Sequence, residues 1–154
     1  MPDTVVCVGA LVRKGERVLL VRQAEGHPLA GQWTIPWGRI DQGESAAKAA
    51  LRETLEEGRG VARVEGLLGV QELPPPWQGW LALVYQCEHI RGDPQADEKE
   101  TDAAGYFSER ELDALDQPIE PWSEWLVRRR FSGKLTLIRS CDPTNPFFPS
   151  IGFL

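Results

Sequence analysis

The chain has 154 residues, of which 42% are hydrophobic and 26% are charged, and this length and composition suit one globular domain with its own core. Its formal net charge of −6 excludes the general basic field that binds nucleic acids or anionic membranes without specificity. We therefore expect neither nucleic acid nor membrane as a partner.

The three cysteines, Cys7, Cys87 and Cys141, lie far apart and without the spacing of a metal site, so free thiols in a reducing compartment are the simplest account of them. No stretch approaches the length of a membrane-spanning helix. The apolar run at residues 5–12 is too short for a signal peptide and lacks a basic leader. We expect a cytoplasmic protein.

Two apolar runs open the chain, at residues 4–12 and 17–23, and a turn sequence separates them. Their β-branched, nearly continuous apolar character predicts a hairpin within a buried sheet. Arg22, near the end of the second run, could reach a substrate phosphate, or it could simply be solvated. A short strand at residues 33–36 should then deliver the chain to the next segment.

Residues 38–60 predict a loop, one acidic helix and a second loop. Ser45 is the expected N-cap, and the helix should run to about Glu57. At about 100° per residue, Leu51 and Leu55 point away from the acidic side chains of the helix. We therefore expect one face to be buried and the opposite face to hold negative charge.

Three carboxylates share that acidic face, those of Glu53, Glu56 and Glu57. They repel one another, and they lie in the C-terminal half, where the helix dipole also disfavours anions. Oxygen ligands in a cluster suit a hard cation, Mg²⁺ first and Mn²⁺ second. The alternative is a solvated acidic face that Lys48 and Arg52 partly neutralise.

The segment resembles the signature G-x5-E-x7-R-E-U-x-E-E-x-G-U of the Nudix (MutT-like) hydrolase family, in which U is a bulky apolar residue. Thr54 and Arg59 depart from the pattern, and either Gly58 or Gly60 could end the helix in place of the usual glycine. Trp37 stands where family members frequently have a glycine. The matching positions are Gly38, Glu44, Arg52, Glu53, Glu56 and Glu57.

The resemblance implies an α/β fold, a Nudix-like α/β/α sandwich around a central mixed β-sheet. It also implies metal ligation by the helix carboxylates, catalytic roles for Glu53 and Glu57, and an orienting role for Arg52. A mobile acidic loop is expected at residues 91–102 and could supply a further glutamate as a ligand or general base. The candidates there are Glu98 and Glu100, and a solvated charge run is the alternative.

Candidate substrate contacts lie outside the acidic helix. Strands are expected at residues 61–71 and 80–89, separated by a stiff loop that contains three prolines. Trp77 and Trp80 could stack on a nucleobase, or they could anchor this loop. Arg39, inside the signature, is also a candidate substrate-binding residue.

The C-terminal part should contain a strand at residues 103–107, a short helix capped by Ser108, and a longer helix at residues 119–131 with an apolar stripe. We expect residues 1–154 to form one domain. The apolar tail at residues 134–154 should pack on that domain or on a second subunit, which leaves a monomer or a homodimer open.

The expected reaction is metal-dependent hydrolysis of a pyrophosphate bond in a nucleoside diphosphate linked to another moiety, of the ADP-ribose or nucleotide-sugar type. The substrate is thus a small nucleotide. Three alternatives stay open: a pyrophosphatase that removes unwanted nucleoside triphosphates, an RNA cap hydrolase, and a non-catalytic nucleotide-binding module with the same fold. The acidic net charge and the lack of a basic arm disfavour the RNA cap hydrolase.

Overall fold

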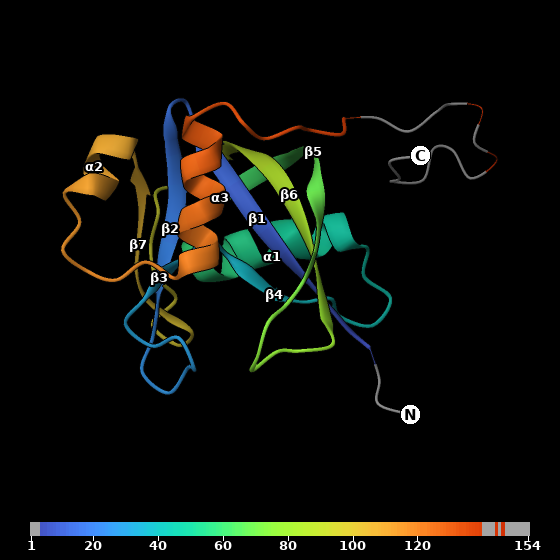
Figure 1. Cartoon of the computed structure of the whole chain (residues 1–154), viewed down its shortest axis with the longest axis horizontal. Coiled ribbons are helices and arrows are strands. Elements are labelled where there is room, and N and C mark those ends of the chain that lie inside the picture. Colours follow the sequence, from blue (N-terminus) through green and yellow to red (C-terminus); the bar gives the residue numbers. More distant parts are fainter. Residues whose placement is uncertain (1–3, 140–143, 145, 147–154) are drawn as a thin grey trace.

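One mixed sheet of seven strands forms the middle of the computed structural model, which describes residues 4–139, 144 and 146 (Figure 1). The strands are β1 (Val5–Lys14), β2 (Arg17–Gln23), β3 (Trp33–Thr34), β4 (Trp37–Arg39), β5 (Val61–Glu72), β6 (Trp80–Arg91) and β7 (Thr101–Phe107). They follow the order β3-β2-β1-β6-β5, with β4 beside β1 and β7 beside β2. β1 and β6 run parallel and the other pairs antiparallel, so the predicted mixed sheet is confirmed.

β1 changes partner along its length. It pairs with β2 at the turn, where Lys14 lies opposite Arg17, and this confirms the predicted hairpin. Further back, β1 pairs with β4, and Val8 lies opposite Gly38. The single strand predicted at residues 33–36 is instead two short strands, β3 and β4, on either side of Pro36, which has no backbone N–H to donate. This register fixes the position of Gly38.

Three helices accompany the sheet: α1 (Ala46–Gly58), α2 (Glu109–Asp113) and α3 (Pro121–Phe131). α1 and α3 cover opposite faces, as the predicted sandwich requires (Figure 1). Consecutive β1 residues serve the two cores, because Val12 packs on the α1 side and Leu11 on the α3 side. Burial of both faces explains the nearly continuous apolar run of this strand.

The packing of α1 differs from the prediction in one important respect. Glu53 and Glu57 are buried, with exposed fractions of 5% and 3%, whereas Leu55 is 48% exposed. The helix meets the sheet through small residues such as Ala50, and it therefore carries two acidic side chains into the interior beside them. The prediction that Leu55 lies on the buried face, opposite the acidic side chains, is wrong.

The ends of α1 follow from local hydrogen bonds. Ser45 is the N-cap and its hydroxyl accepts from the Lys48 N–H at 3.3 Å, as predicted. Neither neighbouring glycine supplies the left-handed residue at the other end, because Arg59 itself adopts it, with φ of 59°. Gly58 has a different role, since a Cβ there would lie 2.9 Å from the buried Leu19 side chain.

α2 and α3 were predicted with different success. The capping box of Ser108 at the start of α2 is present, and Pro121 opens α3. Trp125 does not belong to a buried stripe, because 52% of its surface is exposed and its ring packs under Arg129. Within the described part of the chain, no helix has the length and apolar character needed to cross a membrane.

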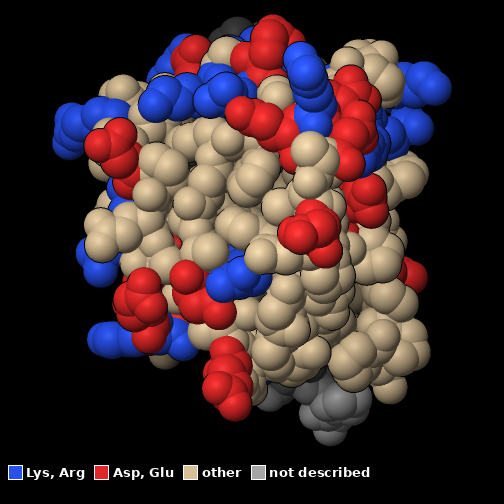
Figure 2. All heavy atoms as spheres, turned by 90° about the vertical axis from the view of Figure 1, so that its left-hand side faces the viewer, with Lys and Arg blue, Asp and Glu red and all other residues tan. Residues whose placement is uncertain are grey.

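The face that carries α2 and β7 has a mixed surface. Figure 2 shows acidic and basic side chains interspersed around an uncharged centre, with no continuous basic field on this side.

Residues 134–139 lie against the chain's own β5. Leu67 and Ile138 exchange two backbone hydrogen bonds of 2.9 Å. Gly66 permits this approach, because a Cβ there would collide with the Ile138 carbonyl oxygen. The described start of the tail thus packs on its own domain, while most of residues 140–154 lies outside the described residues and the prediction for them stays open.

Replacing Gly66 with alanine should displace residues 134–139 and lower the free energy of unfolding by about 1–3 kcal/mol, as overpacking does. Gly60→Ala is the matched control, because its Cβ would meet only an ordinary contact of 3.6 Å with Tyr106. Chemical denaturation of both variants measures the difference. Equal stability of the two variants would contradict the role assigned to the Ile138 contact.

Candidate metal and substrate site

Three carboxylates converge at one end of the sheet. Glu53 and Glu57 come from α1, and Glu100 comes from the loop before β7; one oxygen of each lies within 4.8 Å of the others. The two helix residues are buried, whereas Glu100 is exposed. The group therefore has an interior side, formed by the helix, and a side that opens to solvent.

Gly38 makes the close approach of β4 to α1 possible. A Cβ at this position would collide with both oxygens and the carboxyl carbon of Glu53. The backbone of β4 can therefore pass against this carboxylate only because the residue has no side chain. The glycine of the signature thus has a steric reason.

Arg52 binds several groups around the cluster at once. Its Nε and Nη2 donate to the two oxygens of Glu44 at 2.9 and 3.0 Å. Nη1 donates to Glu53 at 2.7 Å and to Glu56 at 3.1 Å, and Nη2 also reaches the Arg39 carbonyl at 2.8 Å. These bonds hold the loop before α1 against the helix, and an orienting role for Arg52 stays a prediction.

The loop that carries Glu100 is fixed by Asp97 and Thr101. Asp97 Oδ1 accepts backbone N–H bonds from Lys99, Glu100 and Thr101 at 2.8, 2.8 and 2.9 Å. The buried Thr101 hydroxyl donates to the Glu57 carbonyl at 2.9 Å. The loop is thereby anchored to the last turn of α1, and Glu100 is held near the helix carboxylates.

Burial dominates the electrostatics of the cluster. It raises the pKa of Glu53 to about 7, although the hydrogen bond from Arg52 acts in the opposite direction. The pKa of Glu57 is raised well above its usual value, first by burial and then by the charges of Glu53 and Glu100; a backbone hydrogen bond from Trp37 lowers it. Arg52 therefore compensates only part of the negative charge of the cluster.

A hard divalent cation fits this deficit. One Glu57 oxygen is buried and has no hydrogen-bond partner among the described residues. The donor set consists only of carboxylate oxygens, which Mg²⁺ and Mn²⁺ prefer. Arg52 holds the Glu53 carboxylate, and Thr101 anchors the loop that carries Glu100 to the Glu57 backbone. Glu53, Glu57 and Glu100 are therefore the residues that could hold such an ion.

A pocket of about 490 Å³ opens over the carboxylates. Three tryptophans and a histidine form part of its other walls, and the Arg39 guanidinium lies 4.8 Å above the Trp80 ring. Trp77 comes from the proline-containing loop and contacts Trp37 edge to face, at 5.4 Å between ring centroids. The wall residues outside the cluster include His27, Trp37, Arg39, Asp41, Trp77 and Trp80.

The structure does not bring every predicted site residue into the close group. Glu56 is half-exposed and paired with Arg52, and Glu98 is exposed with a left-handed φ of 62° and does not line the pocket. Arg22 also lies outside the pocket lining, paired with Asp102 at 2.7 Å. Roles for these three residues stay predictions. The predicted site residues that line the pocket are Arg39, Arg52, Glu53, Glu56, Glu57, Trp77, Trp80 and Glu100.

Two further wall residues had no committed role in the sequence interpretation. His27 is held by its own loop, where its Nδ1 accepts the Leu29 N–H at 3.0 Å, and its ring contacts Trp37. Trp37 stood out only as a departure from the expected glycine. No spacing rule connects His27 to the acidic helix, so only the folded arrangement of the loop at residues 24–32 could reveal it.

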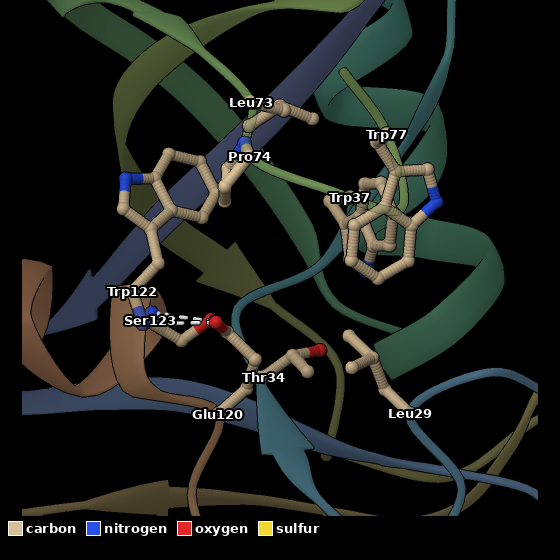
Figure 3. A pocket seen from close by; sticks show the side chains of 9 residues that line it. All are labelled: Leu29, Thr34, Trp37, Leu73, Pro74, Trp77, Glu120, Trp122 and Ser123. Carbon is tan, nitrogen blue, oxygen red and sulfur yellow. Dashed lines mark hydrogen bonds between the residues drawn. The ribbon is translucent and has the colours of Figure 1, made fainter.

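A second, apolar pocket of about 60 Å³ adjoins the first (Figure 3). Figure 3 shows Trp37 and Trp77 close together on one side and Trp122 across the space from them. The two pockets share Trp37 and Trp77 as wall residues.

Comparison with known proteins gives consistent matches. The sequence model of the NUDIX domain matches residues 2–129. The chain is 26% identical over 117 residues to the NAD-capped RNA hydrolase NudC of Pectobacterium carotovorum, covering 76% of this chain and 44% of that protein. It is 28% identical over 126 residues to the ADP-ribose pyrophosphatase of Methanocaldococcus jannaschii, covering 78% and 73%.

Solved structures agree on the fold. A NUDIX hydrolase from Nitrosomonas europaea matches with a TM-score of 0.75 at 23% identity, covering 89% of this chain and 77% of that one. The chain spans less than half the length of the Pectobacterium relative. The structural likeness therefore supports the fold, and support for an activity comes from the carboxylate site.

The raised pKa values predict how pH affects the metal-free protein. The usual glutamate pKa is 4.5, and in the folded state that of Glu53 is about 7. The stabilisation that protonated Glu53 contributes is complete at a pH below its pKa in the unfolded state. It is lost as the pH rises through its pKa in the folded state. The melting temperature of chelator-treated protein should therefore fall from about pH 5 to about pH 8.

Added Mg²⁺ should reverse much of this fall, because the ion binds the ionised carboxylates. Glu53→Gln removes one titrating group and should show a shallower dependence on pH. A melting temperature that rises over this interval, or that ignores Mg²⁺, would contradict the electrostatic account of the cluster.

Proposed function

The chain belongs to the Nudix hydrolase family, and we propose that it hydrolyses a pyrophosphate bond in a nucleoside diphosphate linked to another moiety. The proposed substrates are of the ADP-ribose or nucleotide-sugar type, and the proposed cofactor is Mg²⁺, with Mn²⁺ as a substitute. The observation that carries the proposal is the buried Glu57 oxygen without a partner, inside a carboxylate group that faces an open pocket.

A diphosphate needs positive charge in a pocket whose nearest side chains are acidic. When bound, Mg²⁺ supplies charge against the phosphates and makes water more acidic. Arg52 donates to four hydrogen-bond partners and also lies 3.4 Å from Asp41, whereas Arg39 makes no ion pair among the residues described. Arg39 lines the pocket, and it therefore remains available to contact a phosphate.

Proton transfer requires a carboxylate near the reacting water. A general base must be ionised and within hydrogen-bond reach of the proton that it accepts. Glu100 is the exposed member of the group and is held by the Asp97 loop. We assign cation binding to Glu53 and Glu57 together with Glu100, and proton acceptance to a glutamate of this group.

The remainder of the substrate would lie against the aromatic wall. A base that stacks on Trp77 or Trp80 would gain about 1–3 kcal/mol, without a strict requirement for one base. The Methanocaldococcus jannaschii relative is named for ADP-ribose, which is a nucleoside diphosphate joined to a sugar. That relationship supports the substrate class proposed for this chain.

Hydrolysis of a panel of nucleoside diphosphate sugars and nucleoside triphosphates with Mg²⁺ tests the proposal. The diphosphate-linked substrates should be preferred, with nucleoside monophosphate as a product.

Glu57→Gln should lower kcat more than about a hundredfold while the fold is kept, because it removes a buried charge that the ion needs. Glu56→Gln should lose about tenfold or less, because its partner contact is exposed.

Two results would contradict the proposal. Equal losses in the Glu56 and Glu57 variants would refute the assignment of the close group. Failure to cleave any member of the panel, while a nucleotide still raises the melting temperature, would favour a binding module.

A further inference from the structure

The two pockets are separated by two shared wall residues, Trp37 and Trp77. The acidic pocket has a volume of about 490 Å³ and the apolar pocket about 60 Å³, and Trp37 contributes to both walls (Figure 3). A space of about 60 Å³ is well below the cavity of about 150 Å³ that binds a benzene ring in an engineered protein. A planar nucleobase therefore does not fit into the apolar pocket while the Trp37 indole is in place.

The Trp37 ring is held by rings from two different loops. His27 contacts it edge to face with the ring centroids 6.1 Å apart, and Trp77 does so at 5.4 Å, with interplanar angles of 90° and 86°. Such pairs contribute about 0.5–1.5 kcal/mol each beyond their buried area. The indole is thus a fixed wall and differs from an open stacking surface.

The backbone and the side chain of Trp37 have separable roles. Its backbone hydrogen bond lowers the pKa of Glu57, and β4 keeps this backbone in register with β1. A substitution of the side chain leaves both in place. Any change in substrate preference after such a substitution can therefore be distinguished from damage to the carboxylate group.

The polar groups that line the apolar pocket already have partners. Both Glu120 oxygens cap α3, accepting from Trp122 N–H at 2.9 Å and Ser123 N–H at 2.7 Å. The Ser123 hydroxyl accepts from Ile35 N–H, and the Thr34 hydroxyl accepts from Gln23. What this pocket can offer a ligand is chiefly apolar surface, from residues such as Leu29 and Pro74.

We propose that Trp37 is a specificity-determining residue that separates the two pockets and confines the nucleobase to the acidic one. The substrate class rests on the proposed function, whereas the separation rests on the pocket geometry. Because the confined base cannot use the apolar pocket, the protein should discriminate weakly between purine and pyrimidine. Shortening Trp37 joins the pockets, and the larger purine then gains more buried apolar area.

Calorimetric binding of AMP and CMP in the presence of Mg²⁺ tests the separation. In the wild-type protein the two Kd values should agree within about threefold, and in Trp37→Ala AMP should bind about tenfold more tightly relative to CMP. Trp37→Leu, which keeps more apolar volume, should give a smaller shift in the same direction if the alanine variant does not fold. Trp37→Phe retains a ring wall and should behave like wild type.

Trp125→Ala is the matched control, because this exposed tryptophan on α3 lines neither pocket and should leave the AMP to CMP ratio unchanged. In Trp37→Ala, the ratio of the KM values for ADP-ribose and its cytidine counterpart should change as the ratio of the Kd values does, with little change in the ratio of the kcat values. An unchanged ratio in both the alanine and leucine variants, or an equal loss of affinity for both nucleotides, would overturn the proposal.

The two proposals fail separately. Shifted binding ratios without hydrolysis of any substrate would refute the proposed function and support the separation by Trp37. Hydrolysis with unchanged ratios would support the function and refute the separation.

Discussion

The burial of two like charges on one turn of α1 is the constraint on which the rest of the site depends. Glu53 and Glu57 are nearly inaccessible to water, and a third carboxylate, that of Glu100, approaches them from another loop. Arg52 compensates only part of this charge, because most of its donors are used by Glu44 and the loop before the helix. Buried charges without partners are costly, so the arrangement is stable only with protons or a cation.

The surrounding architecture serves this arrangement. The change of partner along β1 admits β4, and Gly38 in β4 leaves room for the Glu53 carboxylate. Thr101 ties the loop of Glu100 to the end of α1. The helix thereby provides the chemistry, while the loops at residues 24–32 and 73–79 build an aromatic wall that can accept the remainder of a substrate.

The sequence predicted what depends on short-range spacing. Local rules predict the N-cap at Ser45, the hairpin, and the proximity of the Glu53 and Glu57 carboxylates, and the structure agrees. The sequence alone could not show that Glu57 is buried while Leu55 is exposed, because the small side chains of α1 decide which face approaches the sheet.

Long-range packing decided the remaining assignments. Glu98 and Glu100 are the same residue type in the same loop, so the sequence alone does not distinguish them. The hydrogen bonds of Asp97 fix the backbone so that Glu100 lies near α1 and Glu98 does not. Arg22 has a suitable charge, but Asp102 on the neighbouring strand pairs with it. His27 and Trp37 meet only after the loops have folded, so local pattern could not place them together.

The central claim is that the ion lies among Glu53, Glu57 and Glu100. A crystal structure of the protein with Mn²⁺, with anomalous difference density recorded for the metal, tests it most directly. The account predicts a peak in the acidic pocket surrounded by oxygens of these three residues. A peak held instead by Glu56 or Glu98, or no peak in this pocket at millimolar Mn²⁺, would contradict it.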